Sequence, residues 1–515
     1  MRYGFAIDQG TCIGCHACTV ACKTEHRIPV GQFRTWVKYV DKGAYPATNR
    51  EFAVMRCNHC SDAPCVRICP TKALFKRPDG IVDFDSDRCI GCKSCQQACP
   101  YDAIYIDEDS HTAAKCNFCA HRVDRGLEPA CVVVCPTHSI WAGDLDDPTS
   151  GISRLVASRP TAVRAPEQNT APNVFYLNAD RVALDPLAAP VDGTYIYAKP
   201  DPDRARFARE QGMPARGEAR TTLNTAHPHP WGWRVIAYLW TKSVAAGSLL
   251  AAALLILILG ERGPLVTLWA PAVALTFSGV TGVLLIWDLK RPERFHYIFL
   301  KANPTSWLVW GALAFGAFSG LSALWLLFGV LARVGKPPLV PLGPGLTVLS
   351  WVALPLGAIT AGYSALLFNQ AEGRDLWQSP IFFWHLLDQA LLAGAGSLLF
   401  LSFPAGPTAT ARHLLLVVLL GASLVHLLLL AVEHTAQHPS RQAAVASRLM
   451  IFGPYRRQFW LGAVCMPALT AGLALPPVVS PGLWPLGAVG GAVVQLGLLG
   501  YESAFVRAGQ DVPLS

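Results

Sequence analysis

The second half of the chain consists of long apolar stretches separated by short polar loops. Eight stretches after residue 230 are long enough to cross a bilayer, at roughly 234–259, 264–287, 306–331, 344–368, 380–403, 411–432, 459–476 and 481–505. A helix of about 20 apolar residues spans the hydrocarbon core of a membrane. A single stretch could be a buried helix of a soluble core, but eight in series predict an all-α eight-helix transmembrane bundle over residues 231–515.

The first part of the chain has short apolar runs that polar residues interrupt. The segments IVDFD and YDAIYID alternate apolar and polar positions, and the turn Asp79-Gly80 precedes the first of them. This pattern predicts small strands and hairpins, so residues 1–180 are expected to form an α+β domain. Residues 181–230 are polar, rich in proline and without sustained periodicity, which predicts a linker. Within it, residues 199–230 are expected to be a free tether.

Sixteen of the 17 cysteines precede residue 136 and form an internal fourfold repeat. The four groups are Cys12, Cys15, Cys18, Cys22; Cys57, Cys60, Cys65, Cys69; Cys89, Cys92, Cys95, Cys99; and Cys116, Cys119, Cys131, Cys135. Groups one and three read C-x2-C-x2-C-x3-C, whereas the middle gap has four residues in group two and eleven in group four. A proline follows the last cysteine of groups two, three and four, as in ferredoxin-type runs.

This spacing suits cubane iron-sulfur clusters. Three thiolates on one tight loop can hold three corners of a [4Fe-4S] cube, while the fourth, after three more residues, points away and ligates a partner cluster. Sixteen cysteines thus supply four [4Fe-4S] clusters with four thiolates each. Zinc knuckles or a disulfide framework are the alternatives, because CxxC pairs also bind zinc. Zinc sites do not need the C-P ending, and a disulfide framework would imply export.

Composition and charge agree with a membrane protein. The chain is 52% hydrophobic and only 15% charged, which is too apolar for an ordinary soluble protein. The net charge of +8 does not indicate nucleic acid, because the basic residues form no aromatic-interleaved patch. The segment MRYGFAIDQGT before the first cysteine is short and contains no twin-arginine pair, so no cleavable export signal is expected.

The basic residues of the loops predict an orientation. With eight spans, both ends of the anchor lie on the face that carries the cysteine-rich domain. That face holds ten basic residues and the opposite face four: Lys290, Arg291, Arg294, Lys301, Arg374, Arg441, Arg448, Arg456, Arg457 and Arg507 against Arg262, Arg333, Lys336 and Arg412. The positive-inside rule therefore predicts that the cysteine-rich domain lies on the cytoplasmic face of a bacterial or archaeal cytoplasmic membrane. The alternative is that an export signal on a partner subunit carries the folded domain across the membrane.

The cysteine-rich half resembles a known family. CIGCHACTVACK, RCNHCSDAPCVRICP, RCIGCKSCQQACPYDAIY and KCNFCAHRVDRGLEPACVVVCP are similar to the four-cluster subunit of the complex iron-sulfur molybdoenzymes, of the dimethyl sulfoxide and polysulfide reductase type. The segment APEQNTAPNVFYLN resembles the tail of such subunits, which wraps their ferredoxin fold. The resemblance implies a dicluster-ferredoxin-like domain of two pseudo-repeated halves with four cubane sites.

The same resemblance implies how the cysteines are shared. Groups one and four share two clusters in that family, and groups two and three share the other two. Carried over, set A is Cys12, Cys15, Cys18 with Cys135; set B is Cys22 with Cys116, Cys119 and Cys131; set C is Cys57, Cys60, Cys65 with Cys99; and set D is Cys89, Cys92, Cys95 with Cys69. The sequence assigns neither pair of sets to the membrane side.

The apolar half resembles the NrfD-type, polysulfide-reductase family of quinone-reactive anchors. The similarity lies in WDLKRPERFHYIFLKANPTSW and in the ending RAGQDVPLS. It implies a menaquinone or ubiquinone near the cluster-bearing face. Tyr363 is similar to the tyrosine that hydrogen-bonds the quinone in this family, and the alternative is a tyrosine of the interfacial aromatic belt. Tyr238 stands where relatives have a histidine, with Lys242 one helical turn further on, although snorkelling to the membrane surface explains Lys242 equally well.

Other polar residues inside the predicted spans are functional candidates, because lipid solvates them poorly. His385 and Asp388 are spaced i, i+3 and either relay protons of the quinone or form an inter-helix hydrogen bond. Asp288, Arg291, Glu433 and His434 lie at span ends, as a proton entry or a docking surface. Only His385 and His426 are histidines well inside spans, and facing pairs are not evident, so no haem is expected.

Together these features predict an electron-transfer and membrane-anchor subunit that is not itself catalytic for the final substrate. It would relay electrons between the membrane quinone pool and a separate catalytic subunit, which the resemblance suggests is a molybdopterin enzyme. A first alternative is the wiring subunit of a hydrogenase or cytochrome-type respiratory complex. A second is a redox-sensing or assembly protein, which unaltered turnover after Tyr363→Phe and Lys242→Ala would favour. No nucleic acid partner is expected.

Overall fold

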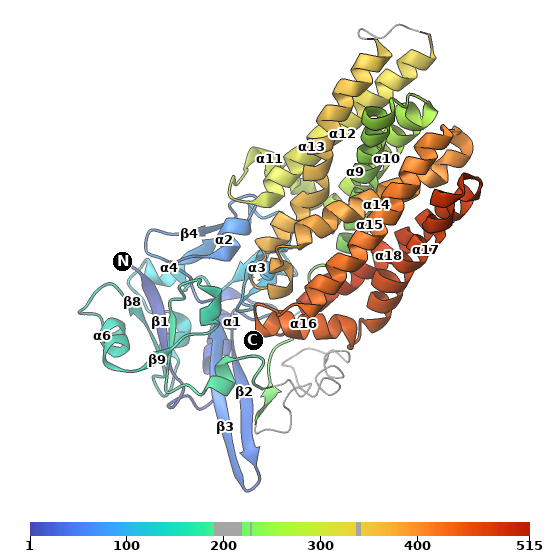
Figure 1. Ribbon diagram of the computed structural model, residues 1–515. Helices are drawn as coiled ribbons and strands as arrows, with labels where there is room; N and C mark the ends of the chain where they lie inside the picture. Colours follow the sequence, from blue (N-terminus) through green and yellow to red (C-terminus); the bar gives the residue numbers. More distant parts are fainter. Residues whose placement is uncertain (190–218, 227–228, 336–340) are drawn as a thin grey trace.

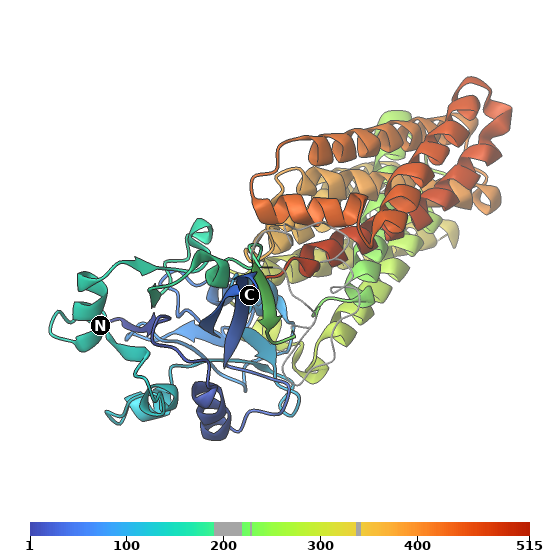
Figure 2. The ribbon, with the colours of Figure 1, turned by 90° about the horizontal axis from the view of Figure 1, so that it is seen from below.

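The computed structural model describes residues 1–189, 219–226, 229–335 and 341–515. Figure 1 shows two parts, a domain of strands and short helices at the N-terminal end and a bundle of long helices at the C-terminal end. The view from below in Figure 2 shows the two parts end to end, with the C-terminus at their junction. The predicted fold class, an α+β domain followed by an eight-helix transmembrane bundle, is confirmed.

A four-stranded sheet forms the centre of the N-terminal domain. Its strands are β8 (Ile140–Asp144), β1 (Tyr3–Asp8), β10 (Val174–Leu177) and β9 (Thr161–Ala162), in that order. β1 runs parallel to β10 and antiparallel to β8. The segment expected to wrap the domain is therefore a strand within it, because the VFYL run is apolar enough to be buried beside β1.

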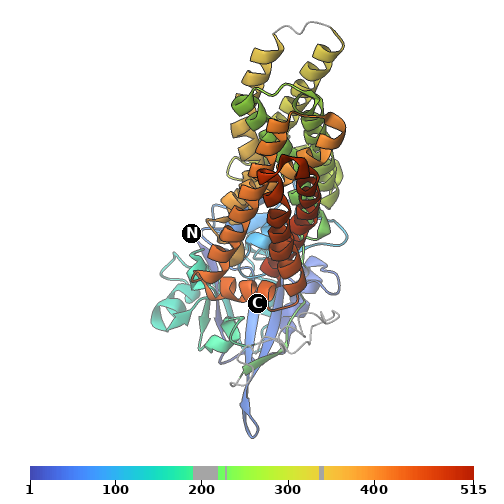
Figure 3. The same cartoon turned by 45° about the vertical axis from the view of Figure 1, so that its right-hand side comes forward.

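A second sheet carries a long hairpin, seen pointing away from the bundle in Figure 3. β2 (Thr35–Ala44) pairs with β3 (Ala47–Arg56), and β11 (Ala219–Leu223) adds to the free edge of β2. Two small hairpins follow the cysteine groups, β4 (Leu74–Lys76) with β5 (Val82–Phe84) and β6 (Ile104–Ile106) with β7 (Ala113–Lys115). They include the predicted segments IVDFD and YDAIYID.

Short helices hold the ends of the cysteine groups. They are α1 (Ala17–His26), α2 (Pro64–Ile68), α3 (Ser94–Ala98), α4 (Ala120–Val123) and α5 (Ala130–Val133), and α6 (Gly151–Ser158) and α7 (Arg181–Leu184) come later. α1 and α3 each begin directly after a left-handed residue, His16 and Lys93. This sharp entry turns the cysteine loop back on itself, so its thiols converge while the cysteine at the helix end faces elsewhere.

In the part of the chain that the structure describes, eight helices are long and apolar enough to span a membrane, as predicted. They are Trp233–Leu259 (α9), Leu265–Asp288 (η2 and α10, Ala270–Asp288), Trp307–Arg333 (α12), Leu342–Asn369 (α13), Phe382–Ala405 (α14), Ala409–Thr435 (α15), Gln458–Val479 (η5 and α17, Met466–Val479) and Pro481–Asp511 (η6 and α18, Trp484–Asp511). Two further helices, α11 (Tyr297–Leu300) and α16 (Arg441–Ile451), lie in loops on the side of the N-terminal domain. Lys336, one of the basic loop residues used to predict the orientation, lies outside the described residues.

Loops of the bundle pack tightly against the N-terminal domain. The backbone of Gly91 sits so close to Lys290 that a Cβ atom there would collide with the lysine side chain, and Gly373 packs equally tightly on the Gln97 and Cys99 carbonyls. Both positions therefore need glycine. At the chain end, Leu514 is buried and its carbonyl accepts a hydrogen bond from Arg164 at 2.7 Å. These contacts fix the two parts against each other.

The linker prediction needs a correction. Residues 190–218 and 227–228, most of the predicted tether, lie outside the described residues. Residues 219–223, however, are the strand β11, which pairs with β2, so this end of the predicted linker belongs to the N-terminal domain. The reason is that the free edge of β2 supplies hydrogen-bond partners that the local sequence ARTTL does not reveal.

Candidate functional site

The structure gathers the cysteines of groups two and three around two separate cavities. One is lined by Cys57, Cys60, Cys65 and Cys99, together with apolar residues such as Ala63 and Ile104. The other is lined by Cys69, Cys89, Cys92 and Cys95. These are sets C and D, each built from three cysteines of one group and the last cysteine of the other.

The cysteines of groups one and four come together in the same crossed way. Burial raises the pKa of the Cys12 thiol, and the neighbouring Cys135 and Cys15 thiols raise it further. Burial also raises the pKa of Cys22, with additional contributions from Cys116, Cys131 and Cys119 around it. Sets A and B are thus assembled as well.

The four sets form a row. Cys18 of set A interacts electrostatically with Cys131 of set B. Cys116 of set B interacts with Cys57 of set C. Cys95 of set D interacts with Cys65 of set C. The order along the domain is therefore A, B, C, D.

Four of the buried thiols are suited to metal ligation and not to free thiolate chemistry. Burial raises the pKa of the Cys18, Cys60, Cys92 and Cys116 thiols to about 12. A thiolate at such a position needs a cationic partner, and metal binding displaces the proton. Among the described residues, no three His, Cys, Asp or Glu side chains converge closely enough to hold a single metal ion. The cavities of sets C and D instead suit a larger group, such as a cubane, inside four thiols.

Hydrogen-bond donors surround these thiols and were not predicted. The backbone N–H groups of Gly91 and Ala113 donate to Cys89 Sγ at 3.4 Å, and that of Ser139 donates to Cys135 Sγ at 3.2 Å. Such donors stabilise negative charge on cluster sulfurs. His26 Nε2 lies 3.2 Å from Cys119 Sγ. Backbone donors depend on loop conformation, which residue identity alone does not reveal.

Arg56, at the end of β3, places a positive charge beside the thiols of sets A and B. Its guanidinium is fully buried, lies 4.3 Å from the Phe5 ring centroid and donates to Cys131 Sγ at 3.3 Å. Its Nε and second terminal nitrogen have no partner among the described residues. Burial by itself lowers the pKa of Arg56, but thiols of sets A and B more than reverse this and raise it. A buried cation with free donors between two thiol sets fits an anionic pair of clusters there.

Replacing Arg56 with methionine is therefore expected to make the clusters of sets A and B harder to reduce. Loss of a buried positive charge destabilises the reduced, more negative state, and we expect the midpoint potential to fall by about 60 mV or more, a tenfold change in a one-electron equilibrium. Redox titration monitored by electron paramagnetic resonance measures it. Arg50→Met, on the same strand but paired with Asp41 at the surface, is the control. Equal potentials in both variants would contradict the role of Arg56.

The loops of sets C and D contact the membrane anchor. Asn303 donates to the Cys69 carbonyl at 2.8 Å and Arg294 to the Cys89 carbonyl at 3.0 Å. Lys93, next to Cys92, forms an ion pair with Asp288 at the end of α10, with 2.7 Å between Nζ and Oδ2. Cys15 of set A, in contrast, is exposed. Set D, at one end of the row, is thus the set whose loops form hydrogen bonds and an ion pair with the anchor.

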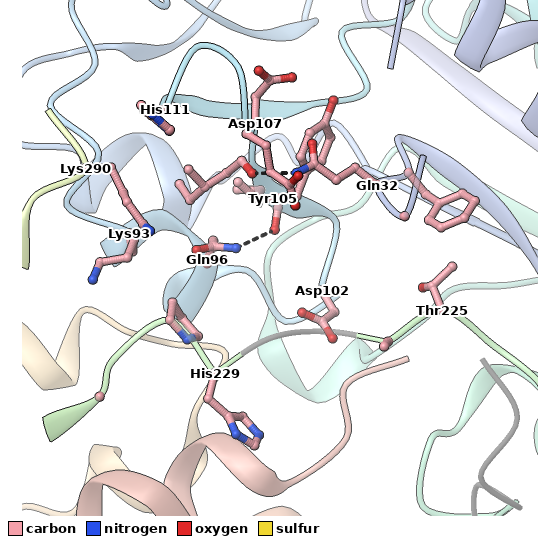
Figure 4. Close-up of a pocket in the computed structure, with 18 of the residues that line it drawn as sticks. Gln32, Lys93, Gln96, Asp102, Tyr105, Asp107, His111, Thr225, His229 and Lys290 are labelled. Carbon is pink, nitrogen blue, oxygen red and sulfur yellow. Dashed lines mark hydrogen bonds between the residues drawn. The ribbon is translucent and has the colours of Figure 1, made fainter. Parts of the chain in front are cut away.

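A cavity of about 850 Å³ adjoins this junction. Figure 4 shows Lys93 from the cluster loop beside Lys290 from the anchor on one side, with Gln96 and Tyr105 across the floor. The Gln96 side chain is fixed because its amide donates to the Ile104 carbonyl at 3.2 Å. Charged side chains of both parts line the cavity, so it lies at the domain boundary and not among the thiols.

Three of the predicted quinone residues lie together inside the bundle. The Lys242 ammonium is fully buried and donates to the Ala361 carbonyl at 2.8 Å and to Ser364 Oγ at 2.7 Å. It also lies 4.7 Å from the ring centroid of Tyr363. Tyr238, on α9, interacts with Tyr363, Ser364 and Asp288. Lys242 therefore points inward and does not snorkel to the membrane surface.

Asp288 connects the group of Tyr238, Lys242 and Tyr363 to set D. It interacts with Tyr238 and forms an ion pair with Lys93 of the set D loop. Sequence reasoning missed another member, Glu502 on α18. Its carboxylate is buried, interacts with Lys242 and with the Trp240 backbone, and bonds no side chain among the described residues. Glu502 lies near the end of the last predicted span, 481–505, where a glutamate is equally compatible with the membrane surface. The hydropathy pattern therefore did not identify it.

His385 and Asp388 lie in a different place. His385 Nε2 is 3.1 Å from His426 Nδ1, and the Tyr501 hydroxyl is 3.2 Å from His385 Nδ1. Asp388 Oδ2 is 4.0 Å from His426 Nδ1. The two histidines bond to each other directly, which leaves no room for a haem iron between them. This network joins α14, α15 and α18, apart from the group around Tyr363.

Comparison with protein families gives two matches. The polysulphide reductase NrfD family matches residues 221–501, more than half of the chain. The 4Fe-4S dicluster domain family matches residues 48–145, which contain groups two, three and four. Both halves of the resemblance inferred from the sequence are confirmed.

Individual relatives match the N-terminal third. A tetrathionate reductase subunit of Salmonella typhimurium is 44% identical over 191 residues, 36% of this chain and 76% of the relative. A polysulfide reductase component of Wolinella succinogenes is 40% identical over 187 residues, 36% of this chain and 98% of the relative. The arsenate respiratory reductase iron-sulfur subunit of a Shewanella species is 34% identical over 227 residues, 35% of this chain and 97% of the relative. Subunits of several reductases are thus similar to the cysteine-rich domain.

Proposed function

The protein belongs to the polysulphide reductase NrfD family, and from this premise we propose that it relays electrons between a membrane quinone pool and a molybdopterin-containing catalytic subunit. It is a fusion of an iron-sulfur electron-transfer subunit with a multi-pass membrane anchor. The observation that carries the proposal is the Lys93–Asp288 ion pair, which joins the loop of set D to the polar group around Tyr238 and Lys242.

In this proposal each thiol set holds one [4Fe-4S] cluster, and the row A to D is the electron path. Set D, against the anchor, exchanges electrons with the quinone. Set A, where Cys15 is exposed, exchanges them with the catalytic subunit. The chemistry on the final substrate takes place in that subunit. The substrate and the direction of flow depend on the partner and on the cluster potentials, which charges beside the thiols such as Arg56 adjust.

Tyr363, Tyr238 and Lys242 are proposed to bind the quinone. A phenol or an ammonium can donate a hydrogen bond to a quinone oxygen while the ring packs among apolar side chains. The Tyr363 ring packs directly on Gly311 of α12, since a Cβ there would collide with the ring. The quinone is menaquinone or ubiquinone. We also propose that the cluster domain lies on the cytoplasmic face of a bacterial or archaeal cytoplasmic membrane, because the loops on its side carry most of the basic residues.

Iron analysis of the purified chain tests the cluster number. Four cubanes require about sixteen irons per chain. The measurement is iron and acid-labile sulfide per mole of protein, checked against quantitative amino-acid analysis. A value near half of that would contradict four clusters and leave only one pair of sets occupied.

Analysis of the complex identifies the catalytic partner. If the partner is a molybdopterin enzyme, the chain purified with its partners contains pterin and molybdenum in amounts equal to that of the chain. A large partner without pterin would favour the wiring subunit of a hydrogenase or cytochrome-type complex. A stoichiometric haem spectrum in the isolated chain would contradict the proposed cofactor set.

A further inference from the structure

In the buried polar network around His385, the donor and the acceptor of each hydrogen bond can be assigned. His426 Nε2 faces the Ala463 carbonyl at 3.2 Å, and because a carbonyl only accepts, Nε2 carries the proton. Nδ1 of a neutral His426 is then an acceptor, so His385 Nε2 donates to it. His385 Nδ1 is in turn the acceptor for the Tyr501 hydroxyl. The network is a chain in which a proton is passed from Tyr501 towards His385.

The Glu433 carboxylate lies where it can stabilise a proton on His385. Glu433 Oε2 is 3.7 Å from His385 Nδ1, and the Glu433 carboxylate also interacts with Ser379. Glu433 lies two positions from the end of α15 on the side of the cluster domain. His434 beside it bonds Ser447 of α16 at 2.8 Å, and Thr435 is exposed. A proton on His385 is therefore close to the cluster-bearing face.

The other end of the network adjoins the proposed quinone group. Tyr501 and Glu502 are consecutive on α18, and consecutive helical residues point about 100° apart. Tyr501 accordingly faces His385 on α14, while Glu502 faces Lys242 on α9. Glu502 is 2% exposed, interacts with Lys242 and the Trp240 backbone, and bonds no side chain in the described part of the chain. A buried carboxylate that no side chain hydrogen-bonds is costly unless it exchanges protons or binds a ligand.

We propose that Glu502 and Tyr501 join the Lys242 group to the His385 network and form the route by which quinone protons reach the cluster-bearing face. The inference rests on the proposed function. Oxidation of one quinol releases two electrons and two protons. The electrons pass to set D, and the protons pass one at a time to the Glu502 carboxylate. Glu502 interacts electrostatically with Tyr501, and a rotation of its carboxyl brings the proton to the Tyr501 hydroxyl as Tyr501 gives its own proton to His385. Glu502 is then anionic again, and Glu433 passes the proton outward. Reduction of a quinone uses the same route in reverse.

Other charged side chains, Lys242 and Asp388, also face the proposed proton route. Lys242 faces Glu502 from α9, and Asp388 faces His426 from α14. Asp388 Oδ2 has no hydrogen-bond partner among the described residues, so Asp388 can store a proton beside the route without lying on it. His434 and Ser447 lie at the outer end. Both residues predicted as proton relays, His385 and Asp388, thus belong to the route and its border and not to the quinone-binding group itself.

The test uses the complex of this chain with its catalytic partner, in detergent, and a short-chain naphthoquinol. Two rates are compared: cluster reduction by the quinol, and cluster reduction by reduced methyl viologen, which delivers electrons without protons. In Glu502→Gln the quinol rate should fall about 100-fold, in the range for loss of a general base, with a larger solvent deuterium isotope effect. The viologen rate should not change. Glu502→Asp should recover much of the quinol rate, and Tyr501→Phe should show an intermediate loss.

Glu261→Gln is the matched control. Glu261 is also a buried carboxylate, but it accepts hydrogen bonds from Thr408 and Gly263 at the opposite end of the bundle. Its quinol rate should match the unmodified complex. The inference is overturned if Glu502→Gln keeps the quinol rate within about twofold, or if the quinol and viologen rates fall together. If the unmodified complex does not react with quinol at all, the proposed function fails instead, and the two failures are distinguishable.

Discussion

Replacing Cys92 with serine is expected to remove one cluster and stop electron exchange with the quinone. Cys92 lines the cavity of set D and is followed by Lys93, which is paired with the anchor. A missing thiolate leaves a cubane without a corner ligand. Iron should fall from about sixteen to about twelve per chain. Because set D ends the row on the side of the Lys93–Asp288 ion pair, cluster reduction by quinol should fall below detection.

The matched control for Cys92→Ser is Cys15→Ser, the second cysteine of the corresponding run in group one. It should lose the same amount of iron, yet quinol should still reduce the clusters of sets C and D, while transfer to the catalytic subunit stops. Cys465→Ser, at an exposed position in the membrane span, should change neither iron nor rate. Electron paramagnetic resonance after rapid mixing separates the clusters. Reduction of the remaining clusters at the normal rate in Cys92→Ser would show that quinone electrons enter elsewhere.

Replacing Lys242 with methionine is expected to slow quinol oxidation about 10- to 100-fold, the factor that loss of hydrogen bonds to a charged group of about 1.5–3 kcal/mol produces. The 10- to 100-fold range applies if the Lys242 ammonium also donates a hydrogen bond to the quinone. Methionine keeps the length and apolar stem but removes the ammonium that bonds the Ala361 carbonyl and Ser364. Glu502 would also lose the cation that it faces. The measurement is the steady-state quinol rate of the complex.

Lys301→Met is the control for Lys242→Met, because Lys301 also lies over a tyrosine ring, 4.0 Å from the Tyr297 centroid, but in a loop outside the spans. It should keep the quinol rate. The viologen rate should be normal in both variants, which shows intact clusters. A normal quinol rate in Lys242→Met would remove Lys242 from the quinone site and favour a redox-sensing or assembly role for the chain.

Local features could be predicted because their cause is local. A cysteine group that begins C-x2-C and ends C-x3-C indicates a cubane loop wherever the loop lies, and about 20 consecutive apolar residues indicate a membrane helix. Tyr363 and Lys242 were predicted as quinone residues by resemblance and by their place in apolar stretches, and this role stays a prediction. The linker was predicted less well, because ARTTL becomes a strand only through the free edge of β2.

Residues that act through distant partners could not be predicted from the sequence. Arg56 ends a hairpin strand and would ordinarily be exposed, yet it is buried between the thiols of sets A and B. Glu502 and Tyr501 have no motif, and their roles depend on which helices face each side of α18. His385 and Asp388 were singled out as polar residues inside a span, but the sequence could not separate them from the quinone group.

The sequence by itself therefore determined the number of thiol groups, the eight spans and the family, since each depends on spacing along the chain. Only the tertiary structure decided that the four sets form a row with set D against the anchor, that Lys93 and Asp288 join the two parts, and that α18 connects two buried polar groups. The physical reason is that these contacts join residues far apart in the sequence. Their geometry is set by helix packing and loop conformation, which no short stretch of sequence encodes.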